Sequence, residues 1–200
     1  MNSNRCVCCG ELIPEGQELI PEGQLICPQC IAKAEGNEDK NLFMLGSSGS
    51  GKSFAAKRGI EWLLSTKQDI HVYVLDAFGE YQSLTTNMQG QVFNVSNDRF
   101  SASSYISDNR FVCYDLEHIS LENETSVYIS LLALIQTLTD KPSFVFVEGI
   151  DTLFQSPNVF RDFCSIITNP EKQNFHYVGI SMDSDPLANC EERGLIEDSF

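Results

Sequence analysis

Basic residues are scarce in this sequence. Lys and Arg together number 13 against 28 Asp and Glu, which gives a formal net charge of −15. Proteins that bind along a nucleic-acid backbone need clustered Lys and Arg to neutralise the phosphates. The charge balance therefore argues against direct nucleic-acid binding over a broad surface.

Long hydrophobic runs are also missing. No stretch of 18 or more apolar residues occurs, so the sequence predicts no transmembrane helix. The first residues, MNSNRCVCCG, lack the apolar core of a signal peptide. We therefore expect a cytoplasmic protein, in which the eight cysteines are thiols or metal ligands rather than disulfides.

Four of the cysteines form two closely spaced pairs. Cys6 and Cys9 are separated by two residues, Cys27 and Cys30 likewise, and 17 residues lie between the pairs. Two intervening residues allow a tight backbone turn that points both sulfurs at one ion, and two such turns complete a tetrahedral zinc site. The spacing predicts a zinc ribbon over residues 1–32 that binds Zn²⁺; reduced, unliganded cysteines are the alternative.

The loop between the cysteine pairs contains the heptapeptide ELIPEGQ twice, at residues 11–17 and 18–24. The extra copy adds only about 0.5 kcal/mol to the entropic cost of closing the loop, so the zinc site should tolerate it. Residues 1–40 hold seven acidic and three basic residues, which favours a protein partner for the ribbon. Residues 33–40 are polar and without periodicity, and we interpret them as a linker to a second domain over residues 41–200.

The most specific motif follows a short apolar strand at residues 41–45. Residues 46–53, GSSGSGKS, fit the pattern G-x-x-x-x-G-K-[S/T] of a phosphate-binding loop. Its glycines let backbone N–H groups turn toward a phosphate, Lys52 reaches the β- and γ-phosphates, and Ser53 offers its hydroxyl to Mg²⁺. A helix predicted over residues 53–66 adds a favourable dipole. The residues expected to bind ATP are Gly46, Ser47, Ser48, Gly49, Ser50, Gly51, Lys52, Ser53 and Phe54.

The rest of the chain alternates between strand and helix patterns. Further strands are predicted over residues 70–76, 91–95, 110–116, 143–147 and 176–181, with helices over 80–88 and 122–139. This alternation predicts an α/β fold, with a mostly parallel sheet covered by helices on both faces. Nucleotide is expected at the carboxyl ends of the strands.

Several stretches in this domain resemble one known family. NLFMLGSSGSGKSFAAKRGIEWLL, VYVLDAFGEY, RFVCYDL, FVFVEGIDTLF and VGISMDSD occur in the order found in conjugative-transfer ATPases, the TraC/TraE-like motors of type IV secretion in the HerA–FtsK group. The resemblance implies a RecA-like P-loop NTPase domain that uses ATP and Mg²⁺. It also implies protein partners in a secretion or mobile-element assembly, and a homo-oligomer. Residues 6–30 resemble bacterial zinc ribbons of the CxxCGxxIPEGxxxCPxC type.

The sequence departs from this family at several places, four of which concern the expected catalytic residues. Residues 76–81 read Asp-Ala-Phe-Gly-Glu-Tyr where the family usually has Asp-Pro-Glu-(Gly/Ala)-Glu-Tyr. Residues 148–149 read Glu-Gly in place of Asp-Glu, and residues 180–183 read Ile-Ser-Met-Asp in place of an Ile-Thr-Gln-Asn sensor. The helix expected to carry an arginine finger contains only Arg161.

These departures bear on hydrolysis. Glu148 can still serve Mg²⁺ together with Ser53, but Gly149 offers no base, and losing a positioned base typically costs about 10²–10⁴-fold in rate. A missing arginine finger costs about 10³–10⁵-fold. Glu80 and Asp151 are the carboxylates that could compensate; the ordinary structural interpretation of Asp151 is a helix N-cap. We expect ATP binding with weak or absent hydrolysis; the alternatives are a zinc-ribbon adaptor with a P-loop scaffold, and an active DNA- or protein-translocating motor.

Other residues are expected to be structural. His71, His118 and His176 have no metal spacing, and Cys113 and Cys164 should pack as small apolar residues. The aromatic residues expected in the core are Phe43, Phe54, Tyr73, Phe144 and Phe146.

Overall fold

The computed structural model describes residues 41–46, 49–96, 100–154 and 157–181. The predicted zinc ribbon and linker lie outside the described residues, as do Ser47, Ser48 and residues 182–200. Among the described helices, none is long and apolar enough to cross a membrane.

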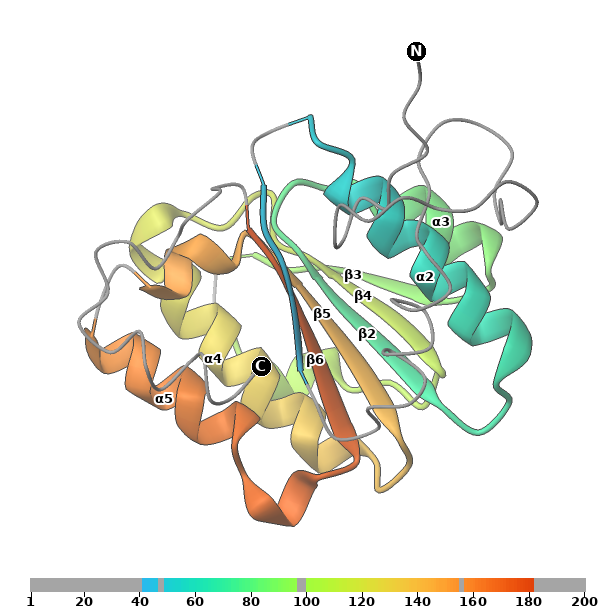
Figure 1. Cartoon of the computed structure of the whole chain (residues 1–200). Helices are drawn as coiled ribbons and strands as arrows, with labels where there is room; N and C mark the ends of the chain where they lie inside the picture. Colours follow the sequence, from blue (N-terminus) through green and yellow to red (C-terminus); the bar gives the residue numbers. More distant parts are fainter. Residues whose placement is uncertain (1–40, 47–48, 97–99, 155–156, 182–200) are drawn as a thin grey trace.

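The described residues form one six-stranded sheet with the order β1-β6-β5-β2-β4-β3, and every neighbouring pair is parallel (Figure 1). The strands are β1 (Leu42–Met44), β2 (His71–Asp76), β3 (Gln91–Asn94), β4 (Phe111–Asp115), β5 (Ser143–Glu148) and β6 (Phe175–Ile180). The predicted parallel α/β sheet is therefore confirmed. β6, the last of the described strands in sequence, lies between β1 and β5.

Helices cover both faces of the sheet (Figure 1). The helices are α2 (Lys52–Thr66), α3 (Gln82–Asn87), α4 (Leu121–Leu138) and α5 (Pro157–Ile167), with 3₁₀ segments η1 (Ala102–Tyr105), η2 (Ile150–Phe154) and η3 (Pro170–Lys172). α2 and α3 lie on one face, and α4 and α5 lie on the other.

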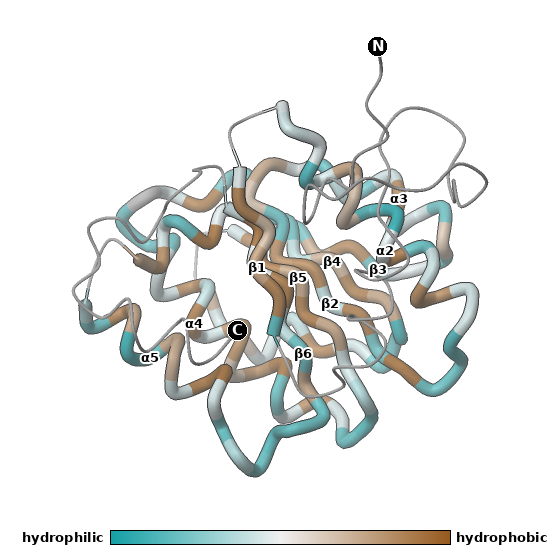
Figure 2. The backbone as a smooth tube through the Cα atoms, in the orientation of Figure 1, coloured by the Kyte–Doolittle hydropathy of each residue, from teal (hydrophilic) through white to brown (hydrophobic). Residues whose placement is uncertain are grey.

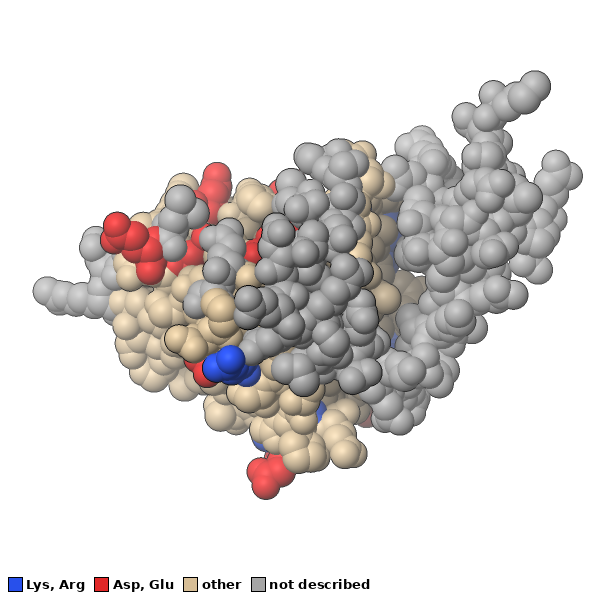
Figure 3. Space-filling model, turned by 60° about the vertical axis from the view of Figure 1, so that its left-hand side comes forward, with Lys and Arg blue, Asp and Glu red and all other residues tan. Residues whose placement is uncertain are grey.

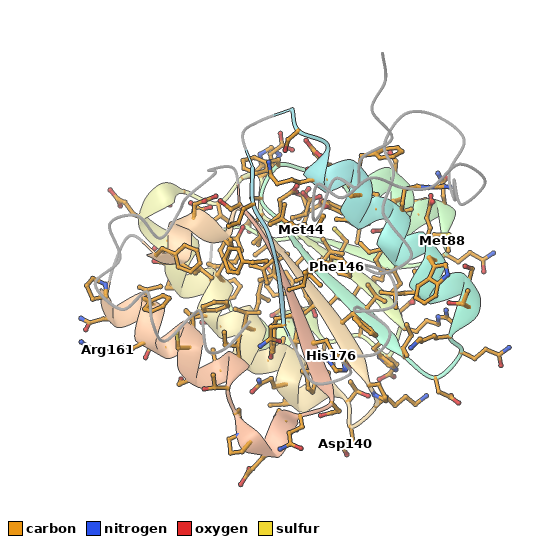
Figure 4. All side chains as sticks on the ribbon, in the orientation of Figure 1. Met44, Met88, Asp140, Phe146, Arg161 and His176 are labelled. Atoms are coloured by element: carbon orange, nitrogen blue, oxygen red, sulfur yellow. The ribbon has the colours of Figure 1, made fainter. Side chains whose placement is uncertain are left out.

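The strands are apolar on both sides because both sides are covered. In β2, Tyr73 and Leu75 pack into the cluster with α4, whereas Val72 and Val74 pack into the cluster with α2. Sheets buried on both faces have nearly continuous hydrophobic strands rather than alternating ones. Figure 2 shows this as hydrophobic colour along the central strands, and Figure 4 shows Phe146 of β5 within this layer.

The segment that follows β5 differs from the predicted one. Gly149 has φ 71° and leads directly into the short 3₁₀ segment η2. Asp151 is the second residue of η2, so its predicted role as an N-cap is wrong. Its carboxylate instead accepts a hydrogen bond from the Ser181 hydroxyl, just after β6.

Gln136 joins three elements on the α4 face. Its buried amide donates to the Ile166 carbonyl of α5 at 2.7 Å and to the Tyr177 hydroxyl of β6 at 2.8 Å. We predict that Gln136→Ala lowers the free energy of unfolding by about 2–3 kcal/mol, because the buried Tyr177 hydroxyl and the carbonyl of the half-buried Ile166 both lose this donor. Thr137→Ala, at an exposed position one residue further along α4, should change it by less than about 0.5 kcal/mol. Urea denaturation measures both, and equal losses would contradict this account.

Candidate nucleotide-binding site

The candidate site lies at the carboxyl edge of the parallel sheet. β1 runs into the glycine-rich loop and α2, and β5 ends at Glu148 next to it. β2 and β4 end at the paired residues Asp76 and Asp115. Parallel strands deliver their terminal residues to one edge, which is where ligands bind in open α/β sheets.

Three glycines shape the loop before α2. Gly46, Gly49 and Gly51 have φ of 148°, 77° and 90°, values that residues with a side chain rarely adopt. A Cβ on Gly46 would also lie only 2.9 Å from the Ser50 hydroxyl oxygen. The glycines of the motif are therefore required by the observed turn.

Lys52 begins α2 and points back into the loop. Its side-chain ammonium donates to the Gly46 carbonyl at 2.6 Å and to the Ser50 hydroxyl at 3.1 Å. Only 8% of Lys52 is exposed. The first turn of α2 carries no acidic residue, so the positive end of the helix dipole is not offset there. An anion that entered the loop would meet this ammonium and the helix N-terminus together.

Ser53 and Glu148 meet across the site. The Ser53 hydroxyl donates to Oε1 of Glu148 at 2.7 Å, which links α2 to β5. Glu148 is fully buried, and its backbone carbonyl accepts a hydrogen bond of 2.6 Å from the Tyr128 hydroxyl of α4. Glu148 is thus held from both faces of the sheet.

Glu148 lies in an acidic environment. Burial is the main cause that raises the pKa of its carboxyl group, to about 7, and repulsion from Asp76 and Glu80 adds to it, while the Ser53 hydrogen bond opposes it. Asp76 is fully buried as well. Burial raises the pKa of Asp76 too, against the effect of hydrogen bonds from backbone amides.

Asp76 fixes the turn that follows β2. Its carboxylate accepts hydrogen bonds from the backbone amides of Phe78, Glu80 and Tyr81 at 3.2, 3.1 and 2.8 Å. The turn 77–81 therefore has a defined path over the carboxyl edge of the sheet. The sequence showed Asp76 at a strand end but gave no sign that its side chain organises this turn.

Within the part of the chain that the structure describes, two buried polar atoms at the site have no hydrogen-bond partner: Oε2 of Glu148 and the Tyr81 hydroxyl. Burial is the main cause that raises the pKa of Tyr81, and electrostatic repulsion from Glu148 is the next largest. A hydrated Mg²⁺ would use an unpartnered carboxylate oxygen and a nearby hydroxyl, since it prefers oxygen ligands and retains waters. The residues present therefore fit Mg²⁺.

The protein alone offers few ligands. Among residues 41–46, 49–96, 100–154 and 157–181, no group of three or more His, Cys, Asp and Glu is arranged to hold a metal. Mg²⁺ commonly binds through one or two protein ligands and the phosphates of a nucleotide. Ser53 and Glu148 match that pattern.

The other predicted site residues have different surroundings. Glu80 pairs with Lys57 of α2 at 3.3 Å, and 45% of its side chain is exposed. Asp151 bonds to Ser181, as described above. Phe54 is 45% exposed, so its placement in the core was wrong, although it remains beside Ser53 at the start of α2. Arg161 is exposed on α5 (Figure 4), on the sheet face opposite α2.

The predicted structural residues are mostly where we expected them. Tyr73, Phe146 and Cys113 are buried, and Phe43, Phe144 and Cys164 are half-buried. His118 is exposed, His71 contacts the Tyr73 hydroxyl at 3.2 Å, and His176 packs against the Phe144 ring. The described surface carries separate patches of Asp and Glu and little Lys or Arg on the face shown in Figure 3.

The raised pKa of Glu148 predicts a pH dependence of stability in protein without Mg²⁺ or nucleotide. The folded protein holds the Glu148 proton up to about pH 7, whereas the ordinary pKa is 4.5. The associated stability is therefore present below about pH 4.5 and is lost as the pH rises through 7. Relative to Glu148→Gln, the wild type should lose on the order of 3 kcal/mol across this range. Urea unfolding of both proteins at several pH values measures the difference, and parallel pH profiles would contradict the prediction.

Two solved structures are similar to this chain at low identity. The genome packaging NTPase B204 from Sulfolobus turreted icosahedral virus 2, in complex with AMPPCP, is 14% identical, with a TM-score of 0.49 over 72% of this chain and 66% of that one. EssC (ATPases 2 and 3) from Geobacillus thermodenitrificans is 13% identical, with a TM-score of 0.41 over 72% of this chain and 28% of that one. Neither likeness carries a conclusion about function.

Sequence relationships are more informative. The uncharacterized protein aq_aa31 of Aquifex aeolicus (strain VF5) is 50% identical over 42 residues, which are 21% of this chain and only 16% of that curated relative. The model of the TraG P-loop domain family matches residues 29–148, more than half of the chain. This match includes the glycine-rich loop, Lys52, Ser53 and β5 through Glu148. The chain therefore belongs to the TraG P-loop domain family.

Proposed function

We propose that this protein binds Mg·ATP at residues 46–53 and hydrolyses it slowly or not at all. The observation that carries the proposal is the Ser53–Glu148 hydrogen bond of 2.7 Å, beside a glycine-rich loop that already encloses the Lys52 ammonium. Membership of the TraG P-loop domain family supports nucleotide binding. ATP would then serve as a structural or switching ligand.

Each residue of the site has a distinct part in binding. Lys52 exchanges its contacts with the loop for contacts with phosphate oxygens, and the loop amides and the α2 dipole add to the attraction. Ser53 and Glu148 would hold Mg²⁺, which supplies neutralisation of phosphate charge when bound. Phe54, 45% exposed beside Ser53, is available to contact the rest of the nucleotide.

The proposal of weak hydrolysis rests on the carboxylates around Glu148. Gly149 has no side chain, and the two candidate substitutes are engaged elsewhere. Glu80 pairs with Lys57, and Asp151 bonds to Ser181. A general base must reach the attacking water with its own oxygen free to accept a proton. Glu80 and Asp151 remain the candidates for any residual turnover.

Nucleotide binding is tested by titration of Mg·ATP with calorimetry. We predict that Lys52→Ala weakens binding at least about 100-fold, since it removes a charged hydrogen-bond donor to the phosphates. Arg58→Ala removes one positive charge from an exposed position on the same helix, where Arg58 pairs with Glu61, and should leave the affinity within about twofold. Equal affinities for the wild type and Lys52→Ala would refute the proposed site.

We further propose that residues 1–32 form a zinc ribbon that contacts proteins of a secretion or mobile-element assembly, including further copies of the chain. The ribbon is supported by the spacing of Cys6, Cys9, Cys27 and Cys30, and the assembly is supported by the family membership of the P-loop domain. We predict one equivalent of zinc per chain by elemental analysis. Cys27→Ser should lose it, whereas Cys190→Ser, outside the motif, should retain it. Equal zinc contents in the two variants would argue against the ribbon.

A further inference from the structure

Two departures from the family pattern meet in space. One lies at residues 77–78, after β2, and the other at Gly149, after β5. A Cβ built on Gly149 would lie 3.0 Å from the Ala77 Cβ and 3.8 Å from Cζ of Phe78. The strands that carry them, β2 and β5, are direct neighbours in the sheet. The two changes that are separate in the sequence therefore lie side by side in the structure.

Gly149 has little freedom to accept a side chain. Its φ of 71° strains any residue with a Cβ, and a 3.0 Å approach to Ala77 is closer than side-chain carbons normally come. Its backbone is fixed on both sides as well. The Gly149 amide donates to the Ile180 carbonyl at 3.0 Å, and its carbonyl accepts from the Thr152 amide at 3.1 Å.

The turn that faces Gly149 is equally constrained. Asp76 accepts the amides of Phe78 and Tyr81, so the turn cannot withdraw without leaving a buried carboxylate unsatisfied. Gly79 completes the turn with φ 68°, and a Cβ there would lie 2.6 Å from Oε2 of Glu117. Phe78 remains 45% exposed while its ring reaches toward Gly149. The Phe78 ring therefore lies at the surface over the buried Gly149.

We propose that Ala77 and Phe78 form a cover over position 149 that closes the approach beside Glu148 to a catalytic carboxylate or an activated water. The inference rests on the proposed function and deepens it. Bound ATP would escape hydrolysis because the position of a general base is occupied by other side chains, and not only because the base is missing. Ala77 and Phe78 are positioning residues that act by exclusion. The Cβ of a glutamate restored at position 149 would press against Ala77, 3.0 Å away, while they remain.

The contact itself is tested by thermal unfolding of four proteins: the wild type, Gly149→Ala, Ala77→Gly and the double variant. The φ strain of Gly149→Ala is the same with either residue at position 77, so the cycle isolates the contact. We expect Gly149→Ala to lower Tm by several degrees in the wild type and clearly less with Gly at position 77. Equal Tm shifts in the two backgrounds would overturn the proposal.

The effect on chemistry is tested by phosphate release from Mg·ATP, with binding of a fluorescent ATP analogue measured alongside. Gly149→Glu alone should remain as slow as the wild type. The triple variant with Ala77→Gly, Phe78→Ala and Gly149→Glu should release phosphate at least about tenfold faster than Gly149→Glu alone. It should exceed the double variant Ala77→Gly, Phe78→Ala by the same factor, since a positioned general base contributes about 10²–10⁴-fold.

The outcomes separate this inference from the proposed function. If Gly149→Glu alone matches the triple variant, position 149 is open and the cover does not exist. If the triple variant binds the analogue but is no faster than the wild type, Ala77 and Phe78 do not limit the chemistry. A wild type that fails to bind ATP, or that hydrolyses it rapidly, would contradict the proposed function instead, and the thermal cycle would still decide the contact.

Discussion

The hydrogen bond between Ser53 and Glu148 is the interaction on which the site depends. It joins α2, which follows the glycine-rich loop, to the last residue of β5 in the middle of the sheet. A fully buried carboxyl group is costly unless its oxygens have partners. Here one oxygen has Ser53, the other has no partner among the described residues, and the Tyr128 hydroxyl fixes the adjoining carbonyl from the opposite face. The fold therefore keeps one strong oxygen ligand unsatisfied beside a loop shaped for phosphate.

The surrounding charges explain why such a site favours a cation together with an anion. Asp76 and Glu80 repel the ionised form of Glu148, while Lys52 and the N-terminus of α2 lie on the loop side. Mg·ATP would satisfy both groups at once, since the ion meets the carboxylate and the phosphates meet the ammonium. The turn 77–81 follows from the same arrangement, because the buried Asp76 carboxylate obtains its hydrogen bonds from the amides of that turn.

Much of the fold and of the candidate site could be predicted from the sequence, because the relevant patterns are local. Lys52 and Ser53 stand at fixed spacing after Gly46, and strands buried on both faces appear as apolar runs, so the loop and the order of elements followed directly. The exposure of Phe54 could not be predicted in the same way, because helix periodicity does not show which turn of α2 extends past the sheet. The partner of Asp151 and the position of Gly149 beside Ala77 depend on which strands are neighbours. β6 returns between β1 and β5, and that placement is a property of the whole sheet.

The central claim is that bound ATP is held rather than consumed. The most direct measurement is a single-turnover experiment, in which protein in excess over ATP labelled at the γ-phosphate is incubated with Mg²⁺ and quenched in acid at intervals. The account predicts that the bound ATP remains intact over many minutes, with conversion no faster than in a Lys52→Ala sample. Conversion of bound ATP to ADP within seconds would contradict it, and would mean that Glu80, Asp151 or a second chain supplies the missing base.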